Sequence, residues 1–132
     1  MRKIILILML VGVSTYWAQA QENEKKEVDV YEEVEQMPEY PGGQDSMKSF
    51  VAKNVKYPPK AIKNEIQGKV FVGFIIDESG NVTNAKIIRS VDIDLDKEAL
   101  RVVNMMEKWT PGKEKGKIVK VKYTLPISFA LK

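Results

Sequence analysis

Apolar and polar residues alternate most regularly near the C-terminal end of the chain. Every second position from Val119 to Leu131 is apolar, and most of the residues between them are polar. This alternation predicts a strand with one buried face, as in an antiparallel sheet covered by helices on one side. Pro126 has no N–H for a strand ladder, so we expect this strand to lie at a sheet edge or to bend there.

A second strand is predicted to open at Gln67-Gly68 and to include the apolar positions up to Ile76. Its two faces are both largely apolar, which indicates a central strand covered on both sides. Residues 77–81 form the expected hairpin loop, in which Gly80 supplies the positive φ angle. The return strand is predicted over residues 82–90.

Three helices are predicted from the remaining apolar spacing. Residues 44–54 carry one apolar stripe, residues 59–64 begin with the second proline of a pair, and a longer helix is capped by Asp92 or Asp94. The stripe of the longer helix contains Leu95, Ala99, Val102, Val103, Met106 and Trp109, and residues 110–112 end it. The predicted fold is α+β, a two-layer domain in which a small antiparallel sheet of about three strands packs against helices.

The N-terminal residues have the pattern of an export signal. Arg2 and Lys3 precede the apolar run 4–13, and Ala18 and Ala20 supply the small residues that a signal peptidase requires. We expect residues 1–20 to be a signal peptide, because a membrane-spanning helix needs about 20 apolar residues and this run is shorter. The alternative is an uncleaved short signal anchor. Either outcome predicts a periplasmic protein.

Charge divides the rest of the chain into two parts. Residues 22–39 carry eight acidic and two basic side chains, whereas residues 40–132 carry ten acidic and seventeen basic ones. We expect residues 21–36 to form an extended acidic tether and residues 37–132 to form the domain. The lysines are spread along strands and loops without the signature of a nucleic-acid-binding module, so nucleic acid is not expected as a partner.

The composition disfavours an enzyme. The chain contains neither cysteine nor histidine, which removes thiol nucleophiles, the commonest general base and the commonest transition-metal ligand. Asp92, Asp94 and Asp96 lack the glycine and distal glutamate of a calcium loop and are better explained as a helix start. We therefore expect a binding protein that needs neither a cofactor nor a metal.

The C-terminal strand has two interpretations as an edge. Lysines and proline commonly blunt a strand edge against aggregation, and Lys120, Lys122 and Pro126 would do so here. The other interpretation is that the edge stays open for an extended peptide, bound through main-chain hydrogen bonds and favoured by acidic flanks. The residues alone leave both interpretations open.

A series of short motifs resembles the C-terminal domain of TonB proteins. The motifs cover about residues 37–132, and the opening Met-Pro-Glu-Tyr-Pro-Gly-Gly segment is similar to versions found in Bacteroidetes-type bacteria. They occur in the order of the family: residues 57–61, 67–70 and 74–82, Leu95 with Ala99, Lys108-Trp109 with residues 111–113, and the strand 118–131.

The resemblance implies a partner and a binding site. In that family the last strand pairs with a short segment of an outer-membrane TonB-dependent receptor, the TonB box, by strand addition. By position this assigns receptor contacts to Ile118, Val119, Lys120, Val121, Lys122, Tyr123 and Thr124. The segment before the Tyr-Pro pair also approaches the receptor, which implies Asn54, Lys56, Tyr57 and Pro58, although the glutamine and first proline of the Gln-Pro-x-Tyr-Pro motif are missing here.

The predicted function is therefore receptor binding in TonB-dependent transport. One alternative is a short anchored energy transducer that couples to inner-membrane motor proteins, if the signal is not cleaved. A second is a structural envelope module that forms a homodimer through its edge strand. As a first test, Val121→Pro is predicted to remove an edge hydrogen bond and to abolish peptide binding while leaving the fold intact.

Overall fold

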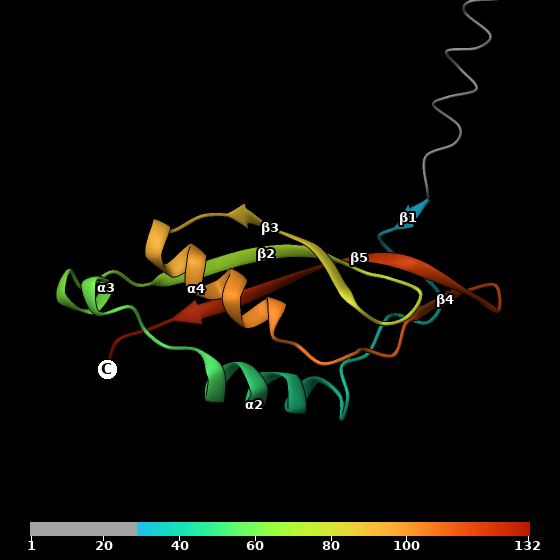
Figure 1. Cartoon of the computed structure of the whole chain (residues 1–132), viewed down its shortest axis with the longest axis horizontal. Coiled ribbons are helices and arrows are strands. Elements are labelled where there is room, and N and C mark those ends of the chain that lie inside the picture. The colour runs from blue at the N-terminus through green and yellow to red at the C-terminus, as the bar shows by residue number, and fades with distance from the viewer. Residues whose placement is uncertain (1–28) are drawn as a thin grey trace, which may run out of the picture.

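A computed structural model describes residues 29–132, which form one α+β domain. The elements follow in the order β1 (Val30–Tyr31), α2 (Gln44–Asn54), α3 (Pro59–Lys63), β2 (Gly68–Ile76), β3 (Val82–Arg89), α4 (Ile93–Asn104), β4 (Gly112–Glu114) and β5 (Lys117–Phe129). The predicted export signal and the first part of the tether lie outside the described residues. Figure 1 shows the long strands β2 and β5 crossing the length of the domain.

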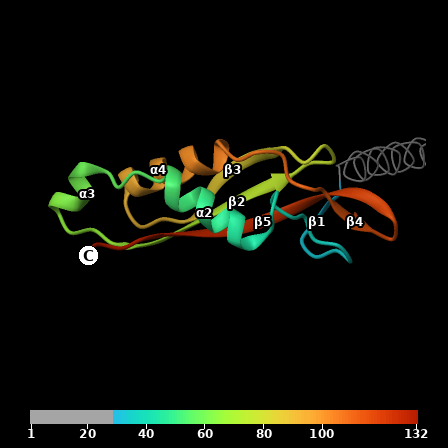
Figure 2. The same cartoon turned by 90° about the horizontal axis from the view of Figure 1, so that it is seen from below.

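The sheet has five strands, rather than the three expected, and is mixed rather than purely antiparallel. Its order is β1-β5-β2-β3, with β4 paired to the start of β5. β2 lies inside the sheet, as predicted, and it pairs antiparallel with both β3 and β5. The expectation that both of its faces are covered is wrong, because the helices lie on one face (Figure 2) and Phe71 and Ile75 on the other face are only half-buried. The two strands that the sequence analysis missed, β1 and β4, contain only two and three residues, too few to show a periodic pattern.

The core lies between the sheet and the helices, which pack on one face of the strands (Figure 2). β2 buries the face formed by Val70, Val72, Phe74 and Ile76, and each of these side chains is almost fully shielded from solvent. α4 supplies Leu95, Ala99, Val102 and Val103 to the same core. Full burial of one such large apolar side chain contributes about 1.5–3 kcal/mol, so these two elements hold the fold together.

α4 begins where the sequence predicts but ends earlier. The Asp92 carboxylate caps the helix by accepting hydrogen bonds from the N–H groups of Asp94 and Leu95, at 3.0 and 3.3 Å. The helix ends at Asn104, so the prediction that it continues to Trp109 is wrong. Trp109 instead lies in an extended segment and packs against Tyr40, Phe74 and Tyr123, with ring centroids 5.1–5.8 Å apart. The apolar spacing continued past the helix because the chain still has to bury this indole.

Candidate peptide-binding edge of the sheet

The two edges of β5 are used differently. One edge pairs with β2 from Val121 to Phe129, and the start of the strand pairs with β4. Lys113 of β4 exchanges backbone hydrogen bonds with Gln36, so its neighbours Gly112 and Glu114 face β5. Backbone groups alternate in direction along β5, so the backbone groups of the β5 partners of these two residues point to the same edge as those of Val121. β4 therefore pairs with the edge of β5 that also pairs with β2, which we call the inner edge.

β1 occupies part of the opposite, outer edge of β5. It runs parallel to β5, with Val30 opposite Lys120 and Tyr31 opposite Val121. In the part of the chain that the structure describes, β5 residues 122–128 have no strand partner on this outer edge. The prediction that β5 is an edge strand is therefore only partly right, because an unforeseen strand covers the middle of the stretch 118–124.

The backbone direction along the outer edge follows from Pro126. The β2–β5 ladder continues on both sides of this proline, which has no N–H to donate. Backbone N–H groups alternate between the two edges of an antiparallel strand, so the backbone of Pro126 faces the outer edge. The backbone N–H groups of Lys122, Thr124 and Ser128 point to the same outer edge. The backbone N–H of Val121 points to β2 instead, and its side chain is fully buried. Proline at Val121 would break the core ladder, so that substitution is not the conservative test the sequence analysis expected.

A groove runs beside the unpartnered stretch of β5. It has a volume of about 400 Å³ and lies between α2 and six consecutive β5 residues. The α2 side is mainly apolar, with Met47, Val51 and Ala52 at the wall and Lys48 at the rim. An exposed strand edge with an apolar wall beside it offers both backbone hydrogen bonds and side-chain contacts to an extended chain. The lining residues not foreseen from the sequence are Gln44, Met47, Lys48, Val51, Ala52, Val55, Leu125, Pro126, Ile127 and Ser128.

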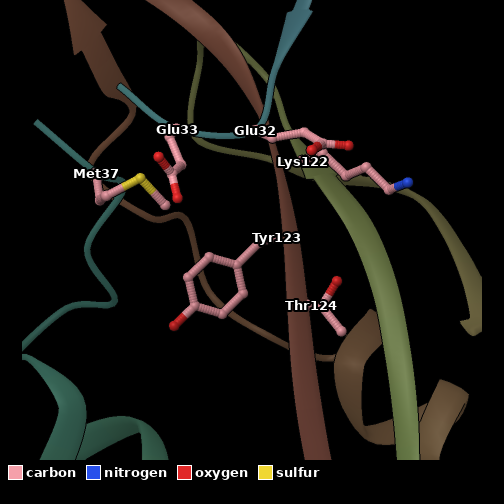
Figure 3. Close-up of a pocket in the computed structure, with 6 residues that line it drawn as sticks. All are labelled: Glu32, Glu33, Met37, Lys122, Tyr123 and Thr124. Atoms are coloured by element: carbon pink, nitrogen blue, oxygen red, sulfur yellow. The ribbon is translucent and has the colours of Figure 1, made fainter. Parts of the chain in front are cut away.

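The chain that follows β1 crosses β5 at the end of this groove. Glu32, Glu33 and Met37 line a cavity of about 580 Å³ together with Lys122, Tyr123 and Thr124. Figure 3 shows Glu32 beside Lys122, whereas Glu33 and Met37 lie near the ring of Tyr123. The part of the expected acidic tether that the structure describes thus pairs with the sheet and contacts predicted binding residues. In the sequence, the only sign of this contact was that the tether is acidic and β5 carries lysines.

The second predicted contact segment lies elsewhere, between α2 and α4. The Lys56 N–H donates to Glu98 Oε2 at 2.6 Å, and the Tyr57 hydroxyl donates to the Ile66 carbonyl. Asn54 uses its side chain to donate to the Phe50 carbonyl at 2.8 Å, and Pro58 precedes α3 as its N-cap. Lys56, Tyr57 and Pro58 line a separate hollow with α4 rather than the β5 groove. The structure therefore does not bring the two predicted contact sets together in one cleft.

Glu98 is the one buried charged residue in the described chain, and its partners account for it. Arg101 binds both of its carboxylate oxygens at 2.7 Å and also donates to the Asn54 carbonyl at 2.7 Å. The hydrogen bonds from Arg101 hold the pKa of Glu98 below its ordinary value, while burial acts in the opposite direction. The cluster fastens the end of α2 to α4, which is a structural role.

No group of three or more aspartate, glutamate, cysteine or histidine side chains within residues 29–132 is placed to hold a metal ion. Over the same residues, none of the helices has the length and apolar character needed to cross a bilayer.

These features define a small α+β domain whose mixed sheet keeps one edge partly open beside an apolar groove. The family described as the Gram-negative bacterial TonB protein C-terminal matches residues 53–131. The chain therefore belongs to the TonB C-terminal family, and its recognition from sequence motifs is confirmed.

Individual relatives agree with the family. TonB proteins from two strains of Xanthomonas campestris pv. campestris are 32% identical over 77 residues, which is 58% of this chain and 34% of theirs. The chain thus spans about a third of the length of these curated relatives. A solution structure of the Helicobacter pylori TonB C-terminal domain has a TM-score of 0.51 and 24% identity, covering 70% of this chain and 87% of that one. A second, shorter one gives 0.50 and 25%, covering 67% and 92%. These structures confirm the α+β fold class.

Proposed function

We propose that this protein binds an extended segment of an outer-membrane TonB-dependent receptor and thereby takes part in TonB-dependent transport. The segment adds as a strand to the outer edge of β5, in the periplasm, and no cofactor or catalytic step is involved. The observation that carries the proposal is the unpartnered stretch 122–128 of β5 beside the α2 groove. Family membership supports the class of partner.

The groove suggests which peptide sequences fit. Side chains of an added strand alternate between its two faces, so every second residue would point toward the apolar wall formed by Met47, Val51 and Ala52. Lys48 at the rim and Lys122 on the strand favour acidic residues at the ends or on the other face. The preferred segment is thus extended, apolar at alternate positions and acidic in its flanks.

Thr124 offers the sharpest test of strand addition. Its amide faces outward and its side chain is exposed, so Thr124→Pro removes a donor from the open edge and leaves the β2 ladder intact. Thr124→Val is the matched control, since it loses the hydroxyl but keeps the N–H. The binding probe is a synthetic TonB-box peptide from a receptor of the same bacterium, measured by titration calorimetry with the full chain.

We expect Thr124→Pro to weaken peptide binding about tenfold or more, because a lost hydrogen bond costs about 1–1.5 kcal/mol and the proline ring also crowds the added strand. Thr124→Val should bind like the natural chain, and both variants should melt within a few degrees of it. Equal binding by the proline and valine variants would reject strand addition at this edge.

The same open edge also favours a second candidate function, self-association between two copies. Exposed strand edges pair readily with one another. Sedimentation of the full chain with and without the receptor peptide separates the two functions. A stable dimer that the peptide does not dissociate would favour the structural envelope module over the receptor-binding role.

A further inference from the structure

β1 lies on the edge to which the receptor segment would add. Its two residues stand opposite Lys120 and Val121, in the middle of the stretch 118–124 that family resemblance assigns to the receptor. On either side of Val121, the backbone groups of Lys120 and Lys122 point to the outer edge of β5. The backbone N–H of Tyr31, which lies opposite Val121, therefore points toward this edge of β5. Any strand that extends from the α2 groove past Lys122 meets this segment.

The attachment of β1 is weak compared with that of its neighbours. β1 contains two residues, and the Val30 side chain is 39% exposed. The chain is held more firmly further on, where Gln36 exchanges hydrogen bonds with Lys113 at 3.1 and 2.9 Å, and Glu39 with Thr110 at 3.0 and 2.8 Å. The hydrogen bonds that hold the chain from Gln36 onward therefore do not involve the pairing of β1 with β5.

The chemistry of this segment matches that of the proposed ligand. It supplies main-chain hydrogen-bonding groups in an extended conformation, and Glu32, Glu33 and Glu35 follow directly. β5 presents Lys117, Lys120 and Lys122 and has no acidic residue. The acidic side chains thus favour the paired state by charge complementarity, and their effect should decrease as salt screens it.

We propose that residues 30–35 act as an internal ligand that occupies part of the receptor-binding edge and has to be displaced when the receptor segment binds. This inference rests on the proposed function, because it assigns a competitor to the same edge. The apparent affinity for the receptor is then the intrinsic affinity multiplied by the fraction of molecules in which β1 has left β5.

A disulfide between β1 and β5 tests the displacement directly. The chain has no cysteine, so Val30→Cys with Lys120→Cys introduces a single pair. Paired strands lie about 4.8 Å apart, within the reach of a disulfide. The oxidised double variant should bind the receptor peptide at least tenfold more weakly than its reduced form. Each single-cysteine variant serves as a control against its own reduced form: treatment with the same oxidant should leave its binding unchanged, because it has no partner cysteine on the other strand.

Release of β1 should have the opposite effect. Tyr31→Pro removes the amide that faces β5, and Tyr31→Phe is its matched control with the amide retained. A second probe needs no receptor: the synthetic peptide of residues 29–35, DVYEEVE. We expect Tyr31→Pro to bind this peptide and the receptor peptide at least threefold more tightly than Tyr31→Phe does.

The two probes separate failure of the inference from failure of the proposed function. Receptor-peptide binding that is the same for oxidised, reduced and Tyr31→Pro forms would overturn the internal competitor but leave receptor binding standing. If the 29–35 peptide binds according to the state of β1 while the receptor peptide binds no form, the proposed function fails and the competition for the receptor fails with it. Binding of neither peptide to any form would reject both.

Discussion

Gly80 shows how a single residue determines where the chain after α4 can run. Its φ angle is +88°, as its place in the hairpin loop predicts, and its carbonyl accepts a hydrogen bond from the Trp109 N–H at 2.9 Å. A Cβ atom at this position would lie only 2.0 Å from the Trp109 carbonyl oxygen. The close approach, as well as the positive φ angle, therefore requires glycine. The position of the Trp109 backbone therefore depends on this glycine. The Trp109 indole in turn packs against Tyr123 of β5, with ring centroids 5.1 Å apart.

Gly80→Ala and Gly116→Ala form a matched pair of substitutions. Gly116 also has a positive φ angle, +77°, but a Cβ there would meet nothing within 4 Å. We expect Gly116→Ala to lower the free energy of unfolding by about 1 kcal/mol, from backbone strain alone. Gly80→Ala should cost at least about 2 kcal/mol more, because the Trp109 backbone must also move. Urea unfolding of both variants measures the difference, and equal costs would contradict the steric argument.

At the scale of elements, Glu98 on α4 connects two helices that are far apart in sequence. It accepts the Lys56 N–H just after α2, and its Arg101 partner reaches the Asn54 carbonyl at the end of α2. These hydrogen bonds fix one end of α2, the helix that forms the wall of the β5 groove. Protonation of this carboxylate would weaken the hydrogen bonds that join α2 to α4.

Glu98→Gln is predicted to remove part of the acid sensitivity of the fold. Hydrogen bonds from Arg101 place the pKa of Glu98 below its ordinary value of 4.5, so the unfolded state binds its proton more readily than the folded state. The stabilising contribution is therefore present above pH 4.5 and is lost as the pH falls through the folded pKa. We expect the variant to be about 1–3 kcal/mol less stable at pH 7.

The difference between the natural chain and Glu98→Gln should shrink as the pH is lowered below 4.5. Urea unfolding between pH 3 and pH 7 measures it. A difference that stays constant over this range would show that packing, rather than the charge, accounts for the loss of stability.

At the scale of the whole molecule, stability is concentrated in the middle of the sheet. β2 is paired on both edges and buries four large side chains, whereas β1 is paired on one edge and carries a partly exposed valine. Segments with few buried contacts open at low free energy, and binding elements that move are drawn from them. The arrangement places a two-residue, partly exposed strand on the edge of β5 that the proposed ligand needs.

Hydrogen exchange of the full chain should reveal this gradient. The Tyr31 amide is expected to exchange at least about a hundredfold faster than the Val72 amide, which requires opening of the core. Raising the salt concentration should speed exchange at Tyr31 and leave Val72 unchanged, because the acidic segment is held partly by charge. Equal protection of the two amides would contradict a displaceable β1.

Local sequence patterns predicted much of the fold. α2 occupies residues 44–54 as expected, Asp92 caps α4, and the alternation in β5 correctly identified its buried face. The apolar run of β2 correctly indicated a strand inside the sheet, although only one of its faces is covered by helices (Figure 2). These features depend on residues that are close in sequence, such as a cap and its first turn or a side chain and its neighbour but one. Short-range rules therefore recover them.

The sequence by itself determined the family, the fold class and the strand that carries the candidate site. Only the tertiary structure decided which edge of that strand is open. β1 and β4 are too short to show periodicity. β1 pairs with β5 residues about ninety positions later in the chain, whereas β4 pairs with β5 across a tight turn. Such pairing is selected by the fold as a whole, because a strand edge is satisfied by whichever backbone reaches it.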